Sequence, residues 1–279
     1  MPKSFWPDGA RLVISLSMQF EAGAQPSLNA YSPYASMDSD SPHPAIDSWF
    51  NYGVKEGIPR LLDLFQRKNV KITSHVVGNA ANRAPDLVRE IHARGHEIAG
   101  HGMSWEPHWR WPPEKERASY EESTRLLERL TGTRPVGFNA FALRGSPNTL
   151  GIIQDLGYLY HTDDLSRDEP FFITVNDKPF GVVPYTKRNN DIERFHEQST
   201  TAEMWMQDVK DEFEILYAEA AHRRRMLSIS THDRIGGQPA RVAVLGRFLD
   251  YALKTPGVVC MRKDEIWRWS AEQADTPRE

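Results

Sequence analysis

Short runs of β-branched and long apolar residues recur along this chain, and between most of them apolar residues return every three or four positions. The runs predict buried strands, and the intervening stretches predict amphipathic helices. Residues 11–20 (RLVISLSMQF) form one such run, which stops at the loop-forming residues 21–23 (EAG). We expect eight strands, at residues 11–20, 71–77, 97–100, 135–138, 158–162, 181–184, 226–230 and 258–261.

Helical spacing of apolar residues separates most of these strands. Ile58, Leu61, Leu62 and Phe65 indicate a first helix, which follows a loop rich in proline and serine at residues 25–47. Further helices are expected at about residues 85–94, 113–130, 147–156, 202–221 and 240–253. Alternating strands and helices predict an α/β fold with a parallel sheet, and no G-x-G-x-x-G motif follows the first strand to indicate a dinucleotide site. We expect a distorted (β/α) barrel, and the length of 279 residues suits a single domain over residues 1–279.

The composition suits a folded enzyme that binds a small, nearly neutral molecule. Apolar residues make up 39% of the chain, which is ample for a core, and the formal net charge is −4. This charge balance offers little attraction to nucleic acids or anionic membranes. Cys260 is the one cysteine of the sequence, which excludes an intramolecular disulfide and a cysteine-rich zinc site. The sequence shows neither an export signal nor a long apolar segment, and we expect a cytoplasmic protein.

Histidines and one carboxylate mark the expected ends of several strands. His75, His101, His161 and His232 lie in or directly after four of them, and Glu21 follows the first. In a barrel of parallel strands these carboxyl ends meet at one mouth, where the active site forms. Each histidine also has a simpler interpretation as a hydrogen-bonded residue inside the barrel, and this interpretation is preferred for His75 and His161. His101 and His232 therefore remain, with Glu21, as candidate catalytic residues.

Several segments resemble the polysaccharide deacetylase (NodB-homology) superfamily. They are residues 21–23 (EAG), 95–102 (GHEIAGHG), 131–135 (TGTRP) and 230–232 (STH). Other segments resemble the branch of PuuE-type allantoinases and bacterial cyclic imide hydrolases, namely residues 183–186 (VPYT), 189–191 (NND) and 226–237 (MLSISTHDRIGG), and residues 17–23 and 161–170 resemble the imide hydrolases. The resemblance covers most of the chain. It implies a distorted barrel of the NodB type, hydrolysis of a non-peptide C–N bond and a homo-oligomer, either a dimer or a tetramer.

The chain departs from the superfamily pattern at two positions that concern a metal. Metal-dependent members carry an Asp-Asp pair after the first strand and an H-x-x-x-H segment after the third, whereas this chain has Ala22 and Trp105 at the second position of each. An indole N–H only donates and cannot ligate a cation. We therefore expect a metal-independent enzyme without a cofactor. A divalent metal held through Glu21 and His101 is the alternative, in which His108 either substitutes as a ligand or is a surface or lid residue.

The resemblance and the electronic structure of a cyclic imide together suggest roles for these residues. Two carbonyls of an imide compete for one nitrogen lone pair, so its carbonyl is readily attacked and its nitrogen leaves easily. We expect Glu21 to activate water as general base, His101 to orient that water or polarise the carbonyl, and His232 to protonate the departing nitrogen. The product would be a half-amide acid.

Candidate substrate contacts come from loops that follow the strands. We expect aromatic walls for a flat ring, a polar contact to a carbonyl oxygen and further contacts from the branch-specific segment. These residues are Trp105, Phe138 and Phe141 for the walls, Asn139 or Arg144 for the carbonyl, and Tyr185, Asn189 and Asn190 for the remainder. Ordinary loop packing is the alternative for the aromatic residues.

Three other functions remain open at this point. One is an allantoinase, which performs the same class of reaction on a more polar ring. Another is a metal-dependent deacetylase of polysaccharides or other N-acetyl sugars. The third is a catalytically silent binding protein that kept the barrel. No nucleic-acid or membrane partner is expected in any of them.

Overall fold

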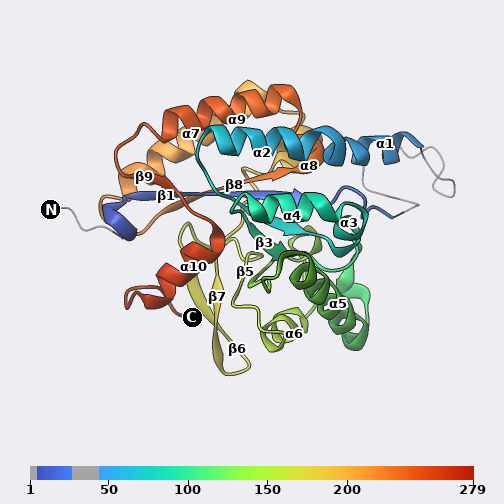
Figure 1. Cartoon of the computed structure of the whole chain (residues 1–279). Coiled ribbons are helices and arrows are strands. Elements are labelled where there is room, and N and C mark those ends of the chain that lie inside the picture. Colours follow the sequence, from blue (N-terminus) through green and yellow to red (C-terminus); the bar gives the residue numbers. More distant parts are fainter. Residues whose placement is uncertain (1–4, 27–43) are drawn as a thin grey trace.

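The computed structural model describes residues 5–26 and 44–279, and one nine-stranded sheet forms its centre (Figure 1). The strands are β1 (Leu12–Phe20), β2 (Thr73–Val76), β3 (Glu97–Gly100), β4 (Gly137–Phe138), β5 (Tyr160–His161), β6 (Phe171–Val175), β7 (Lys178–Val182), β8 (Met226–His232) and β9 (Val258–Cys260). Their order is β6-β7-β5-β4-β3-β2-β1-β8, and β9 also pairs with β1. All neighbouring strands are parallel except the β6–β7 hairpin. The eight expected strands are all present, while β6 was not expected.

A short stretch of backbone closes the sheet into a barrel between β7 and β8. Asn190, which follows β7, forms an isolated parallel bridge with Ser230 of β8. The Ser230 amide also donates to the Asn189 carbonyl oxygen at 3.1 Å. Because one bridge rather than a strand completes the ring, the barrel is distorted as expected. Asn189 is buried where the barrel closes, and its side-chain Nδ2 donates to the Ser228 carbonyl oxygen at 3.4 Å.

Ten α-helices surround the sheet in the part of the chain that the structure describes. They are α1 (Pro44–Tyr52), α2 (Ile58–Arg67), α3 (Gly78–Arg83), α4 (Pro85–Ala93), α5 (Pro113–Thr131), α6 (Thr149–Asp155), α7 (Ala202–Glu219), α8 (Asp233–Gly236), α9 (Pro239–Ala252) and α10 (Lys263–Glu272). Helices α2, α7 and α9 lie over β1 and β8, while α3 to α6 lie by the β3 side (Figure 1). The loop expected at residues 25–47 falls mainly outside the described residues, and its last residues begin α1.

Strand β1 separates the two environments of the barrel. Its alternate residues Leu12, Ile14, Leu16, Met18 and Phe20 belong to the main apolar core with the helices. Since successive side chains of a strand point to opposite faces, the residues between them face the barrel interior. From Ser15 onward these are polar, and Glu21 follows in the same alternation. The barrel therefore has a polar interior that leads to the carboxyl end of β1.

A buried lysine fills the other end of this interior. The Lys263 ammonium group donates to Ser15 Oγ at 3.2 Å, to the Pro184 carbonyl at 3.2 Å and to Ser228 Oγ at 3.3 Å. Burial lowers the pKa of Lys263 to about 7. These bonds connect β1, β8 and the end of β7 below the site.

Within the described residues, no helix has the length and apolarity that crossing a membrane requires.

Candidate active site

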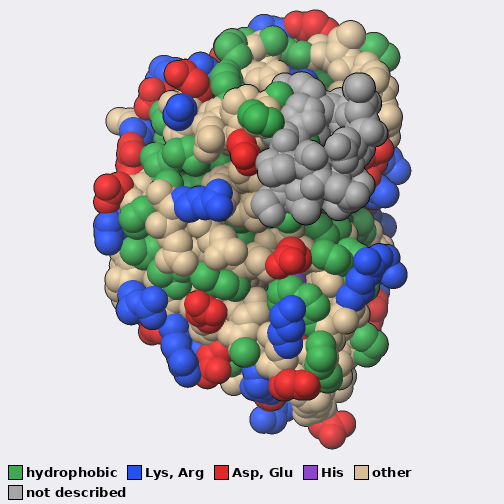
Figure 2. Space-filling model, turned by 90° about the vertical axis from the view of Figure 1, so that its right-hand side faces the viewer, with side chains coloured by type: hydrophobic (Ala, Val, Ile, Leu, Met, Phe, Trp, Pro, Cys, Tyr) green, Lys and Arg blue, Asp and Glu red, His purple; other side chains and the backbone are tan. Residues whose placement is uncertain are grey.

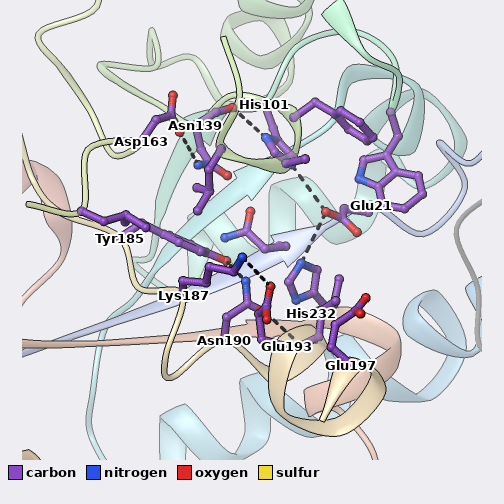
Figure 3. A pocket seen from close by; sticks show the side chains of 17 residues that line it. Glu21, His101, Asn139, Asp163, Tyr185, Lys187, Asn190, Glu193, Glu197 and His232 are labelled. Atoms are coloured by element: carbon purple, nitrogen blue, oxygen red, sulfur yellow. Dashed lines mark hydrogen bonds and ion pairs between the residues drawn. The ribbon is translucent and has the colours of Figure 1, made fainter.

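Three separate strands bring Glu21, His101 and His232 together. Glu21 follows β1, His101 follows β3 and His232 is the last residue of β8. Oε1 of Glu21 lies 3.5 Å from Nε2 of His101 and 3.5 Å from Nε2 of His232 (Figure 3). All three side chains are almost completely buried. The parallel arrangement thus places one carboxylate oxygen between two imidazoles.

Backbone contacts orient the ring of His101. Its Nδ1 lies 2.7 Å from the Asn139 carbonyl oxygen. Because a carbonyl oxygen only accepts, Nδ1 carries the proton and Nε2 faces Glu21. Asn139 is held in turn, since its side-chain amide donates to Thr162 Oγ1 at 3.0 Å and to Asp163 Oδ1 at 2.7 Å. The end of β4 therefore fixes which nitrogen of His101 reaches the site.

A buried aspartate orients His232. Oδ1 of Asp191 lies 2.5 Å from Nδ1 of His232, and Oδ2 accepts from the His232 backbone amide at 2.6 Å. Burial by itself would lower the pKa of His232, but the charges of Glu21 and Asp191 outweigh it and raise this pKa. The two carboxylates therefore favour the protonated imidazole, in which Nε2–H is directed at Glu21.

An arginine holds the second oxygen of Glu21. Nη1 of Arg234 donates to Glu21 Oε2 at 2.8 Å. Burial alone would raise the pKa of Glu21, but the positive charges of His232 and Arg234 hold this pKa far below its ordinary value. Glu21 is therefore a carboxylate at neutral pH. Its Oε1 remains between the two histidines.

Arg234 is fully buried in a box of aromatic rings. Its guanidinium carbon lies 4.1 Å from the ring centre of Phe50, 4.7 Å from that of Trp49 and 5.5 Å from that of Trp105. Its Nη1 also lies 3.2 Å from Oδ1 of Asp233. Aromatic faces attract a cation, so the box and the two carboxylates together stabilise a charge that is otherwise costly to bury.

Asp233 ties the end of β8 to the end of β1. Its Oδ2 accepts the backbone amides of Glu21 at 2.8 Å and Ala22 at 2.7 Å. Gly57 permits this close packing, because a Cβ atom there would lie 1.9 Å from the Asp233 carbonyl oxygen. The backbone that carries Glu21 is therefore anchored by the residue that follows His232.

Sequence reasoning did not assign roles to Asp191, Asp233 and Arg234. Both segments that contain them were among those quoted for the family resemblance. The signal was the charged pair directly after His232, at the carboxyl end of a strand. The guanidinium group of Arg234 reaches Glu21 only because α8 packs against β1 and α1, and no local sequence pattern indicates this packing.

A cavity of about 580 Å³ opens onto Glu21 and the two histidines. Five of the expected substrate contacts line it, namely Trp105, Asn139, Phe141, Tyr185 and Asn190. The Trp105 and Phe141 rings meet edge to face with centres 5.2 Å apart. Lys187, Glu193 and Glu197 also line the cavity, on the side of Asn190 and away from Asn139 (Figure 3).

The expectations for three other substrate contacts need correction. Phe138 has no exposed surface, and its ring packs between Tyr120 and Tyr158 in the core. Arg144 lies with its guanidinium carbon 4.5 Å from the ring centre of Trp109 and does not line the cavity. Asn189 closes the barrel instead. In each case a tertiary contact draws the side chain away from the site.

The remaining candidate histidines have structural environments. His161 stacks on Phe180 with ring centres 5.8 Å apart, and His75 is fully buried beside Gln19. His108 was expected as a ligand or a surface residue, but it is 1% exposed and packs against Trp111 and Tyr120. The structural interpretation therefore holds for His161, whereas the expectation of a surface position for His108 was wrong, because aromatic rings bury it.

The side chains at the site do not fit a bound divalent metal. Glu21 already pairs through Oε2 with Arg234, and Trp105 stands where metal-dependent members place a second histidine. Within residues 5–26 and 44–279, no three His, Cys, Asp or Glu side chains are placed to hold one ion. The positive charge beside Glu21 is supplied by a guanidinium group.

Several known proteins are similar to this chain in sequence and in fold. Residues 38–161 match the family described as Polysaccharide deacetylase. A Schizosaccharomyces pombe protein with the provisional name polysaccharide deacetylase is 24% identical, and the match covers 96% of this chain and 92% of that protein. The crystal structure of a probable polysaccharide deacetylase from Pseudomonas aeruginosa PAO1 superimposes with a TM-score of 0.90 and 34% identity, covering 96% of this chain and 94% of that one.

The crystal structure of PuuE allantoinase is similar to the same degree. It superimposes with a TM-score of 0.90 and 34% identity, covering 97% of this chain and 94% of that one. Two solved structures are thus 34% identical to this chain over nearly their whole length and share its barrel. The match of residues 38–161 to the family agrees with them. This chain therefore belongs to the polysaccharide deacetylase (NodB-homology) family.

Proposed function

We propose that this protein hydrolyses a C–N bond of a small cyclic imide and releases a half-amide acid. The observation that carries the proposal is the Glu21 carboxylate, which lies between His101 and a protonated His232 and is paired with buried Arg234. An imide carbonyl is activated by its own electronic structure. A base, a group that orients water and an acid are therefore sufficient for its hydrolysis.

In the proposed reaction Glu21 Oε1 removes a proton from water as the water oxygen bonds to the ring carbonyl carbon. Nε2 of His101 accepts the second hydrogen of this water, because its proton is on Nδ1. Collapse of the tetrahedral intermediate breaks the C–N bond, and His232 Nε2–H protonates the departing nitrogen. The proton on Glu21 then returns to His232 across the 3.5 Å contact. The imide and one water become one half-amide acid.

The surroundings of the cavity suit a small uncharged ring. Trp105 and Phe141 supply apolar walls, while Asn190 and Tyr185 supply polar atoms. Figure 2 shows the side of the molecule toward which β1 runs, and on its coloured part Lys and Arg are interspersed with Asp and Glu. No one sign of charge dominates this visible part, so it offers little steering to a polyanion.

A panel of five rings tests the proposal. Turnover of succinimide or phthalimide, with hydantoin, dihydrouracil and allantoin much slower, would support it. Turnover of an N-acetylglucosamine oligomer but of none of the rings would contradict it. Product analysis should find a carboxylate and a primary amide in equal amounts.

Allantoin hydrolysis is the second candidate function. Its support is the 34% identity to the PuuE allantoinase structure over nearly the whole chain. Lys187, Glu193 and Glu197 beside the cavity also suit a ring with a polar ureido group. In this case the panel would show allantoin as the preferred substrate.

Removal of divalent metals is expected to leave the hydrolysis rate unchanged. The reason is that Arg234 already pairs with Oε2 of Glu21 and that the indole of Trp105 offers no ligand atom. The measurement is kcat after exhaustive chelation and gel filtration, with elemental analysis of the same sample. Loss of activity that a stoichiometric metal restores would favour a metal-dependent deacetylase instead.

Replacing Asp191 with asparagine is expected to move the alkaline limb of the pH–rate profile to lower pH. The reaction requires protonated His232, so the rate falls as pH rises through the pKa of this histidine. The charges of Glu21 and Asp191 raise that pKa against the effect of burial, and removing one of them lowers it. The profile of kcat/KM against pH measures the shift. An unmoved alkaline limb would show that another group sets it.

A further inference from the structure

Gln19 lies directly below Glu21 inside the barrel. Both residues follow the inward alternation of β1, and Gln19 pairs in register with His75 of β2 and with His232 of β8. The side chain is 1% exposed and lines the cavity. The uncharged side-chain amide of Gln19 therefore forms part of the cavity floor, between His232, the proposed acid, and His75.

The carboxamide of Gln19 is bonded at one end. Its Nε2 lies 3.0 Å from Nδ1 of His75 and donates to Ser230 Oγ at 3.4 Å. Its Oε1 has no hydrogen-bond partner among the described residues. A buried amide oxygen needs a hydrogen-bond donor, and because this one lies beside the cavity, a bound ligand can supply the donor.

His75 can accept a hydrogen bond from the nitrogen of this carboxamide. The ring has no exposed surface, and burial, with the nearby positive charge of Lys263, holds its pKa well below the ordinary value. A neutral imidazole has one nitrogen that accepts. When Nδ1 accepts from Gln19 Nε2, the carboxamide oxygen is the atom left for the cavity.

We propose that Gln19 Oε1 accepts a hydrogen bond from the ring N–H of the substrate and thereby selects rings with an unsubstituted nitrogen. This inference rests on the proposed hydrolysis of cyclic imides. When the attacked carbonyl carbon lies against Glu21 and His101, the adjacent nitrogen lies toward His232. Gln19 is the register partner of His232 on β1.

The two groups would act on different parts of the same nitrogen. The N–H bond lies in the plane of the ring and points to Gln19. The lone pair develops out of this plane as the C–N bond breaks, and it receives the proton of His232. An N-alkyl ring has no N–H to donate and brings a methyl group against the buried oxygen, so it loses the bond and also meets a steric obstacle.

The test compares succinimide with N-methylsuccinimide. We expect the parent protein to show a kcat/KM for succinimide at least about a hundredfold higher than for N-methylsuccinimide. Gln19→Met should lower the succinimide value by about tenfold, mainly through KM, and leave N-methylsuccinimide nearly unchanged. Equal values for both rings in the parent protein would overturn the inference and leave the proposed function standing. Turnover of neither ring would overturn both.

Variants of His75 provide an independent arm of the test. His75→Leu removes the acceptor for Gln19 Nε2 and should reduce the preference for succinimide, whereas His75→Asn offers an oxygen near the position of Nδ1 and should restore it. Thermal unfolding of both variants controls for stability. If His75→Leu and Gln19→Met both fold and keep the preference of the parent protein, Gln19 does not select the substrate.

Discussion

Replacing Glu21 with glutamine is expected to lower kcat by roughly a hundred- to ten-thousandfold, which is the range of a lost general base. The amide keeps the shape of the side chain but cannot take a proton from water. Its oxygen can still accept from Arg234, which pairs with the carboxylate at 2.8 Å. We therefore expect KM for the best substrate of the panel to change much less than kcat. Steady-state kinetics of the purified variant measure both.

Glu193→Gln is the matched control for this substitution. Glu193 lines the same cavity, but its carboxylate pairs with the exposed Lys187 at 3.1 Å. The same chemical change there should leave kcat nearly unaffected. Near-normal turnover by Glu21→Gln would remove Glu21 from the mechanism. A large fall in both variants would indicate a general sensitivity of the cavity to charge.

Replacing Arg234 with methionine is expected to reduce the free energy of unfolding by about 3–5 kcal/mol, because breaking a buried ion pair leaves its partner uncompensated. Here two carboxylates lose their partner, those of Glu21 and Asp233. Urea unfolding at pH 7 measures the loss. Activity should fall as well, since the carboxylate of Glu21 is no longer held in place.

The pH dependence of this loss has a definite sign. The parent protein holds the pKa of Glu21 below its ordinary value, so the stability that ionised Glu21 contributes is present above the unfolded-state pKa and is lost as pH falls. Without Arg234 the folded-state pKa of Glu21 rises. The stability difference between parent and variant should therefore be largest near pH 7 and shrink toward acid pH.

Arg144→Met is the control for the loss of a guanidinium group near the site. Arg144 is exposed and stacks on Trp109. Its replacement should change stability by no more than about 0.5 kcal/mol, as for most surface positions. An Arg234→Met variant as stable as Arg144→Met would contradict the account of a buried charge that compensates two carboxylates.

The strand pattern placed five candidates at strand ends, and the three residues at the centre of the site, Glu21, His101 and His232, are among them. Residues 11–20 read as a strand that ends before Glu21, and the structure forms β1 over Leu12–Phe20. His101 and His232 were recognised in the same way from the ends of β3 and β8. Because parallel strands bring their carboxyl ends to one edge, knowing where each strand ends is enough to predict that these side chains meet.

The strand pattern does not predict which aromatic side chains line the cavity. Phe138 ends β4 and Phe141 follows three positions later, yet Phe141 lines the cavity and Phe138 is buried between two tyrosines. The hairpin of β6 with β7 was also missed, although residues 171–175 (FFITV) carry the aromatic and β-branched residues that are typical of a strand. The different positions of the two phenylalanines depend on which surfaces are present for their side chains to pack against.

The sequence by itself determined the α/β class, the strand ends and the presence of Glu21, His101 and His232 at one mouth, because these follow from patterns within a few residues. The tertiary structure alone decided the charges of the site. The contact of Arg234 with Glu21 joins residues 213 positions apart, and that of Asp191 with His232 joins residues 41 apart. Such pairs form when helices and strands pack and exclude water, and this burial is also what makes each charge depend on its partner.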